Sequence, residues 1–166
     1  MTGYDLILEM VSDVLPGSGA SMPGYVDLDV QKDSRGLPVI RASVFKGNLR
    51  ECAMNIAEWE ALGSKPVDLL FGYGASESAF AGKKLYFSDF RIALGKDLME
   101  YGICDASMNE IFNAVTGIRA NISLEEGVAV DGSLRYVRVI KKGILLLGRI
   151  DADGGLSESE EALLVK

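Results

Sequence analysis

The sequence has no histidine, only two cysteines and a single tryptophan among 166 residues. Without histidine, Ser-His-Asp and Cys-His catalytic centres and most zinc sites are excluded. Cys52 and Cys104 show no metal-binding spacing, so we expect core thiols. No apolar run is long enough to span a membrane, and acidic residues interrupt the first twenty positions, which excludes a signal peptide there. We therefore expect a cytoplasmic protein that has no membrane partner.

Positive charge is scarce overall but is concentrated in one segment. The chain has 17 basic and 24 acidic residues, a net charge of −7, which argues against nucleic-acid binding over the whole surface. Residues 31–50 carry five basic residues against one acidic residue, a net +4, whereas residues 151–166 carry five acidic residues against one basic residue, a net −4. An anion-binding site is therefore predicted in the first of these segments.

Length and patterning predict one mixed α+β domain over residues 1–166. Apolar and polar residues alternate in several short runs, which is typical of strands, and other runs have helical spacing. The expected strands cover 4–11, 25–31, 82–92, 117–123 and 143–150, with a hairpin over 127–140 turning at Asp131-Gly132. The expected helices run from an N-cap at Ser43 to about residue 63, over about 106–115, and onward from a capping box at Ser157 and Glu160. Residues 67–74 are expected to form a short turn.

The stretch before the first helix combines a flexible loop, two acids and a turn. Residues 16–24 contain three glycines and two prolines, which predicts a loop that a ligand backbone can approach closely. In 25–31, strict alternation places Asp27 and Asp29 on one face. Residues 33–36 predict a turn, and residues 37–40 a short extended piece.

These motifs together resemble the RAMP superfamily (repeat-associated mysterious proteins), the RNA-binding subunits of type III CRISPR effector complexes. The resemblance covers nearly the whole chain, and its most specific part is the Leu-Pro-x-Ile, Ser-x-x-Lys-Gly-x-x-Arg pattern over residues 37–50. It implies a ferredoxin-like, RRM-like fold with insertions. The family's C-terminal glycine-rich loop and last strand have no counterpart here, so the chain is expected to be truncated. The first strand is then expected to leave an open sheet edge that favours self-association.

The resemblance implies an RNA site around the loop and the start of the first helix. The residues assigned to RNA binding are Gly17, Ser18, Gly19, Arg41, Ser43, Lys46, Gly47, Arg50 and Tyr86. Unpaired N–H groups at a helix start favour phosphate. The expected partners are a CRISPR guide RNA, target RNA and other effector subunits.

Each assignment has a plainer alternative that stays open. Lys46 and Arg50 also fit a solvated helix face, and Phe87, Phe90 and Trp59 fit core packing better than base stacking. Asp27 occupies the position of the aspartate linked to target RNA cleavage in the family's backbone subunits, so a metal-dependent endoribonuclease is one rival function. In that case Asp27 and Asp29 would hold Mg²⁺; RNA binding alone requires no cofactor.

The other rival function, from a different class, is a ferredoxin-like protein-interaction domain that binds no RNA. The net charge favours it.

Overall fold

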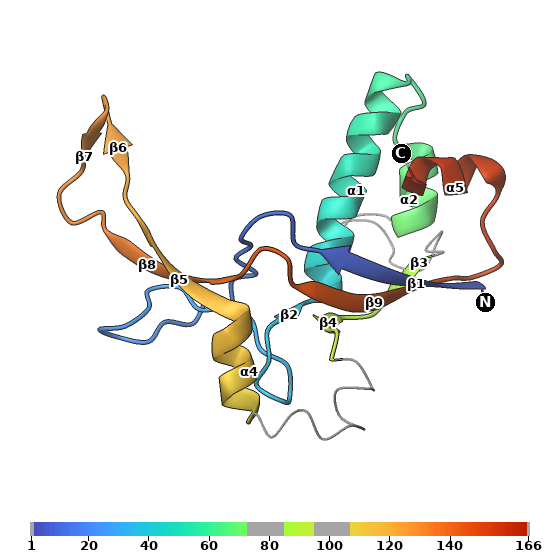
Figure 1. The fold of residues 1–166 in the computed structure, drawn as a ribbon. Helices are drawn as coiled ribbons and strands as arrows, with labels where there is room; N and C mark the ends of the chain where they lie inside the picture. Colours follow the sequence, from blue (N-terminus) through green and yellow to red (C-terminus); the bar gives the residue numbers. More distant parts are fainter. Residues whose placement is uncertain (1, 73–84, 95–106, 166) are drawn as a thin grey trace. The chain divides into compact units, whose positions relative to one another are not determined.

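The computed structural model describes residues 2–72, 85–94 and 107–165 (Figure 1). Helices are combined with antiparallel sheets, in agreement with the predicted mixture of α and β elements. The chain forms two compact units. Unit 1 comprises Met1–Leu6, Arg41–Asp89 and Gly148–Lys166, and unit 2 comprises Ile7–Ile40 and Phe90–Leu147. The assignment of residues 1–166 to one domain and the ferredoxin-like order of elements stay predictions.

Unit 1 contains most of the first strand and the end of the last one. Strand β1 (Thr2–Glu9) alternates between half-buried and exposed residues, as its sequence predicted. It neighbours β9 (Leu145–Ala152) and has no second partner among the strands that the structure describes. Strand β3 (Leu85–Phe87) pairs antiparallel with β9, with Leu85 opposite Ala152 and Phe87 opposite Ile150. The open edge is thus present in the described residues, while self-association through it stays a prediction.

Among the residues that the structure describes, unit 1 contains α1 (Ala42–Trp59), α2 (Lys65–Phe71) and α5 (Glu158–Val165). Buried side chains from α1, α2, β3 and β9 form one apolar cluster. Within it, the rings of Phe71 and Phe87 stack with centroids 6.1 Å apart. Phe87 is therefore a packing residue, and Phe90 is fully buried in unit 2, so the core interpretation of both is confirmed.

Several sequence predictions for unit 1 are wrong. Helix α1 begins at Ala42 with Arg41 as its N-cap, and Ser43 is already inside the helix. Residues 67–71 of the predicted turn over 67–74 belong instead to α2, and residues 73–74 lie outside the described residues. Pro66 is in the first turn of α2, where a missing N–H costs nothing. Trp59 is 82% exposed and Cys52 is exposed, so neither belongs to the core. Cys104, like residues 82–84 of the expected strand, lies outside the described residues.

The capping box that opens α5 is confirmed. The Ser157 N–H donates to Glu160 Oε2 at 2.8 Å, and the Glu160 N–H donates to Ser157 Oγ at 3.4 Å. Both residues thus satisfy backbone groups at the helix start.

Unit 2 pairs β2 (Val39–Ile40) with β4 (Phe90–Ile92), and β4 with the beginning of β9, all antiparallel. The single strand predicted over 82–92 is broken at Ser88 and Asp89, so that β3 and β4 are separate elements. Helix α4 (Met108–Val115) confirms the predicted helix from residue 108 onward, and Ser107 and Glu110 form its capping box.

The longest pairing in unit 2 joins β5 (Thr116–Asn121) to β8 (Arg135–Ile140), from Thr116 opposite Ile140 to Asn121 opposite Arg135. A small hairpin of β6 (Leu124–Glu125) and β7 (Val128–Ala129) lies between them in the chain, at the far end of β5 and β8 in Figure 1. The predicted hairpin over 127–140 is wrong, because its two arms pair with β6 and β5 instead of with each other. Within the described residues, no helix is both long and apolar enough to cross a membrane.

Candidate nucleic-acid interface

The first turns of α1 place the predicted RNA-binding residues of this helix on one stripe. Ser43, Lys46, Gly47 and Arg50 follow the spacing i, i+3, i+4 and i+7, which defines one helix face. Ser43 and Gly47 are exposed, whereas Lys46 and Arg50 are half-buried. A methyl group added at Gly47 would meet no atom within 4 Å, so the helix surface is open at this point. The stripe thus offers cations beside a backbone that another chain can approach.

A carboxylate already occupies the start of α1. The Ala42 N–H donates to Asp89 Oδ1 at 2.9 Å, and Arg41 Nη1 donates to Asp89 Oδ2 at 3.0 Å. Asp89 follows β3 and takes the place at the helix N-terminus where sequence reasoning expected a phosphate, because the same N–H groups and dipole favour any anion. An RNA strand would therefore meet the Arg41 side chain beside Asp89 instead of an open helix end.

Arg50 is also paired with an acid. Its Nη2 lies 2.6 Å from Asp68 Oδ1, which links α1 to α2. Each of Arg41 and Arg50 uses one terminal nitrogen in the ion pair with its aspartate, and a guanidinium has five N–H donors in all. Both arginines thus keep donors for a further anion, although a neighbouring carboxylate offsets part of their positive charge.

The glycine-rich loop belongs to unit 2 and is fixed by its own hydrogen bonds. The Ser18 N–H and hydroxyl both donate to the Asp29 carbonyl at 2.9 Å, and the Ala20 N–H donates to Ser18 Oγ at 3.1 Å. Gly17 and Gly19 are exposed, and Gly19 has φ +73°, a conformation that favours glycine. The predicted loop is confirmed.

Asp27 and Asp29 do not share a face, so that prediction is wrong. Asp27 is exposed, and its Oδ2 accepts a hydrogen bond from the Tyr136 N–H at 2.7 Å. Asp29 is only 5% exposed; Oδ1 accepts from the Val30 N–H at 2.8 Å, and Oδ2 lies 3.0 Å from Lys32 Nζ. Residues 25–31 make isolated bridges instead of a regular strand, which removes the alternation on which the prediction depended.

A shared Mg²⁺ site does not fit this arrangement. The Asp29 carboxylate is buried and engaged by cations and an N–H group, so it is not available beside Asp27. In the part of the chain that the structure describes, no three acidic or cysteine side chains are grouped in a way that would hold a metal ion. The catalytic role of Asp27 stays a prediction. The hydrogen bond that its carboxylate accepts from the Tyr136 N–H links two segments of the backbone.

Tyr86 lies on β3 between two inward residues, and its ring is 41% exposed. The alternation of Leu85, Tyr86 and Phe87 places it on the outer side of the strand, as expected for a residue available to stack on a base. Lys84, predicted to flank it, lies outside the described residues.

Sequence reasoning missed a buried ionic group in unit 2. Arg138 on β8 is 6% exposed, and its Nε lies 3.0 Å from Asp29 Oδ1. A partial signal was present: Arg138 interrupts the apolar stretch 136–140, and Asp29 stands between Leu28 and Val30. Opposite charges between apolar neighbours indicate a buried pair, because either charge alone would be too costly to bury.

These elements define a mixed α/β protein with antiparallel sheets and a basic, half-exposed helix start. A family model for the RAMP superfamily matches residues 7–164. The chain therefore belongs to the RAMP superfamily, which confirms the resemblance found in its sequence.

Among solved structures, the chain is similar to one in the type III-B Cmr-beta bound to cognate target RNA. The two share 12% identity with a TM-score of 0.69, over 100% of this chain and 88% of the other. A chain of type III-B Cmr-beta in the apo state gives 12% identity and a TM-score of 0.71, over 99% and 87%. At this identity the similarity establishes the fold. No curated protein matches the chain.

Proposed function

We propose that this chain is a subunit of a type III CRISPR effector complex and holds the guide RNA by its sugar-phosphate backbone. Membership of the RAMP superfamily and the fold shared with chains of type III-B Cmr-beta support the effector role. One of those structures is bound to cognate target RNA. Target RNA and other effector subunits are therefore proposed as further partners of this chain.

The observation that carries the RNA-binding proposal is the stripe on α1. Lys46 and Arg50 lie beside the open surface of Gly47, and Arg41 stands at the N-cap of the same helix. Phosphate contacts from Lys and Arg position a nucleic acid without reading its sequence. Gly17 and Gly19 supply a second exposed backbone segment in unit 2, and Tyr86 supplies an exposed ring in unit 1.

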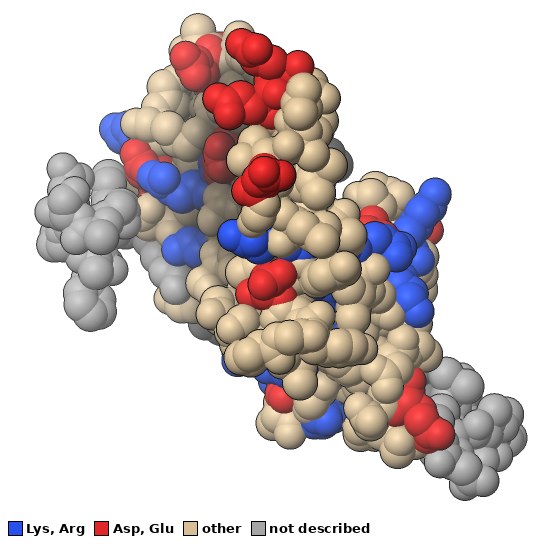
Figure 2. Space-filling model, turned by 90° about the vertical axis from the view of Figure 1, so that its left-hand side faces the viewer, with Lys and Arg blue, Asp and Glu red and all other residues tan. Residues whose placement is uncertain are grey.

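The carboxylates near the stripe limit how tightly it binds. Asp89 and Asp68 compete with phosphates for Arg41 and Arg50. On the face shown in Figure 2, uncharged residues cover most of the surface, and lysine and arginine form separate groups instead of a continuous belt. A restricted contact with a few phosphates is consistent with both observations.

Gly47→Ala tests this proposal, because it separates helix stability from access to the stripe. Alanine fits the open space and favours the helix, so the free energy of unfolding should rise by about 1 kcal/mol. The affinity for a labelled single-stranded RNA, measured by fluorescence anisotropy, should fall at least about fivefold, since a close backbone contact tolerates no side chain there.

Asn55→Ala is the matched control, since Asn55 is an exposed residue further along α1. This substitution also favours the helix, but we expect unchanged RNA affinity. Equal RNA affinity of Gly47→Ala and wild type would show that the stripe is not the binding surface.

A protein-interaction domain without RNA binding is the second candidate. It is favoured by a run of exposed apolar side chains in unit 2 around β5 to β8: Ile122, Leu124, Val128, Leu134 and Tyr136. Isolated exposed apolar residues are ordinary, but a group on one hairpin indicates a protein contact. If the RNA affinity changes neither with ionic strength nor in Lys46→Glu, the result would favour this candidate over the RNA-binding subunit.

A further inference from the structure

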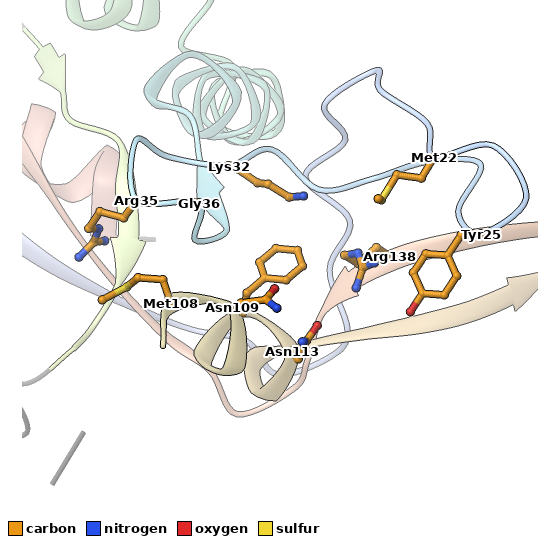
Figure 3. A pocket seen from close by; sticks show the side chains of 10 residues that line it. Met22, Tyr25, Lys32, Arg35, Gly36, Met108, Asn109, Asn113 and Arg138 are labelled. Carbon is orange, nitrogen blue, oxygen red and sulfur yellow. The ribbon is translucent and has the colours of Figure 1, made fainter. Parts of the chain in front are cut away.

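Unit 2 contains a pocket whose described lining residues include none of those assigned to the proposed backbone contact. Its volume is about 510 Å³, within the range of about 300–1,000 Å³ that is usual for sites of small ligands. Figure 3 shows that its lining comes from three stretches: the loop that contains Met22 and Tyr25 and continues to Gly36, helix α4, and Arg138 of β8. All three stretches belong to the same compact unit.

The buried residue Arg138 is part of the pocket lining. Although its Nε is close to the Asp29 carboxylate, the geometry is not that of a hydrogen bond, and Nε has no hydrogen-bond partner within the described residues. Its Nη1 makes one long contact, 3.5 Å, to Thr116 Oγ1. The Asp29 carboxylate nevertheless balances the charge at Nε, and a guanidinium has five N–H donors in all. Arg138 thus lines the pocket with incompletely used hydrogen-bonding capacity.

Two aromatic rings lie next to cations in the pocket. The guanidinium carbon lies 5.0 Å from the centre of the Phe112 ring and 5.6 Å from that of Tyr25, and Lys32 Nζ lies 4.6 Å from the Phe112 centre. Phe112 is buried, whereas Tyr25 is 58% exposed and leaves part of its surface open. A flat ring next to a planar guanidinium is the kind of platform on which an unstacked base is held.

Helix α4 adds two side-chain amides to the lining. Asn109 and Asn113 are exposed, line the pocket and lie four residues apart on α4, so both are on one helix face. Each amide has two donors and a carbonyl acceptor, which allows paired hydrogen bonds to the edge of a base. None of the lining residues that the structure describes is acidic. The cations Lys32 and Arg138 share Asp29, and Arg35 pairs with Asp33, so three cations face two carboxylates.

We infer that this pocket holds one unpaired nucleotide of a single-stranded RNA, with its base against Tyr25 and Arg138 and its edge toward the amides of α4. The inference rests on the proposed RNA-binding function and adds a base contact to it. An apolar ligand would leave the two amides without partners, and a simple phosphate would leave the rings unused.

The first test compares an RNA decamer with a decamer of the same backbone that lacks bases. Base stacking on an aromatic side chain contributes about 1–3 kcal/mol, which corresponds to about 5- to 100-fold in affinity. Tyr25→Ala should therefore reduce binding of the base-containing decamer by about this factor and leave the abasic decamer unaffected. Asn109→Ala, which favours the helix, is the second variant. It should reduce the ratio of the affinity for the base-containing decamer to the affinity for the abasic decamer.

Tyr136→Ala and Asn121→Ala are the matched controls, because both residues are exposed in unit 2 and neither lines the pocket. We expect them to keep the wild-type ratio of the two affinities. An unchanged ratio in both Tyr25→Ala and Asn109→Ala would overturn the pocket proposal. The backbone proposal would still stand if Gly47→Ala weakened binding of both decamers.

The second test measures ligand binding in the pocket without a longer RNA. Nucleoside 5′-monophosphates are titrated into the wild-type chain while the side-chain amide NMR signals of Asn109 and Asn113 are followed, with ribose 5-phosphate and inorganic phosphate as controls. Saturable shifts from the nucleotides alone support the pocket, even if no decamer binds and the backbone proposal therefore fails. Equal shifts from inorganic phosphate would overturn it in favour of a simple anion site.

Discussion

At the scale of single residues, Asp33 shows how a turn predicted from sequence is stabilised. Its Oδ1 accepts from the N–H groups of Arg35 and Leu37 at 2.9 and 3.1 Å, and its Oδ2 accepts from Arg35 Nε at 2.9 Å. Burial of the Asp33 carboxyl disfavours its ionised form, but the hydrogen bonds from Arg35 and Leu37 outweigh burial. They lower the pKa of Asp33 below its ordinary value of 3.8.

Asp33→Asn should therefore have a pH-dependent effect. A lowered folded-state pKa means that the ionised carboxyl stabilises the fold above about pH 3.8, and that this contribution is lost as the pH falls through the folded pKa. At pH 7 we expect the free energy of unfolding to fall by about 1–2 kcal/mol, and by less at pH 3. Urea denaturation at both values measures the difference. Asp131→Asn, at an exposed turn residue, is the control. An equal loss at pH 3 and pH 7 would contradict the ionic origin.

Residue burial could be predicted only where a local pattern decides it. Phe87 and Phe90 are packed as expected. Trp59 and Cys52 follow the helical spacing of the apolar residues of α1, but both are exposed. Periodicity identifies an apolar face, whereas the width and length of its buried part depend on which elements pack against it. Asp29 is buried because Arg138, distant in the sequence, compensates its charge, and no short window contains both.

At the scale of elements, the β6–β7 hairpin turns through two residues with positive φ. Glu126 has φ +49° and Gly127 has φ +82°, the arrangement of a type I′ turn, which prefers Asn-Gly. A glutamate in this left-handed conformation is unfavourable because of its Cβ. The hairpin therefore contains a residue that is not suited to its backbone.

Glu126→Asn should stabilise this hairpin. Asparagine tolerates positive φ, so amide hydrogen exchange across β6 and β7 should slow about two- to fivefold, which corresponds to ~0.5–1 kcal/mol. Glu125→Asn removes the same charge from the neighbouring strand residue and should not slow exchange. Faster exchange in Glu126→Asn would contradict the turn assignment.

Elements with strong local signals were predicted well, and pairing was not. The Ser157 capping box and the helix near 108–115 follow from local patterns. The hairpin prediction failed because Asp131-Gly132 is a good turn sequence, yet β8 pairs with β5 over six residues. Helix α2 was missed because its apolar run is short and its stability depends on burial of Val67, Leu70 and Phe71.

At the scale of the whole molecule, a net charge of −7 means that the proposed RNA contact has to be local, against an unfavourable overall field. The family could be identified from sequence, and so could the candidate helix with its basic residues. The pairing of Arg41 with Asp89 and of Arg50 with Asp68 could not, because each carboxylate comes from another element.

The salt dependence of RNA binding should reflect this small contact. Each phosphate neutralised on a single strand contributes about −0.7 to the slope of log K against log salt, so three cations predict a slope of roughly −2. Lys46→Gln should make the slope shallower by about 0.7. Lys142→Gln, at an exposed turn residue of unit 2, should not change it. Binding measured from 50 to 300 mM salt, about the range over which such slopes are resolved, checks both. A slope near zero would exclude phosphate contacts.

The order of the segments has a consequence for how the protein is made. Unit 2 is complete once Leu147 has been synthesised, whereas unit 1 needs its opening strand, its middle helices and the segment that starts at Gly148. During translation, β1 must therefore wait for β9, and α1 and α2 remain without the strand that completes their core. Apolar surface exposed in that interval is open to misassembly, so the nascent chain is most exposed to it before β9 has left the ribosome.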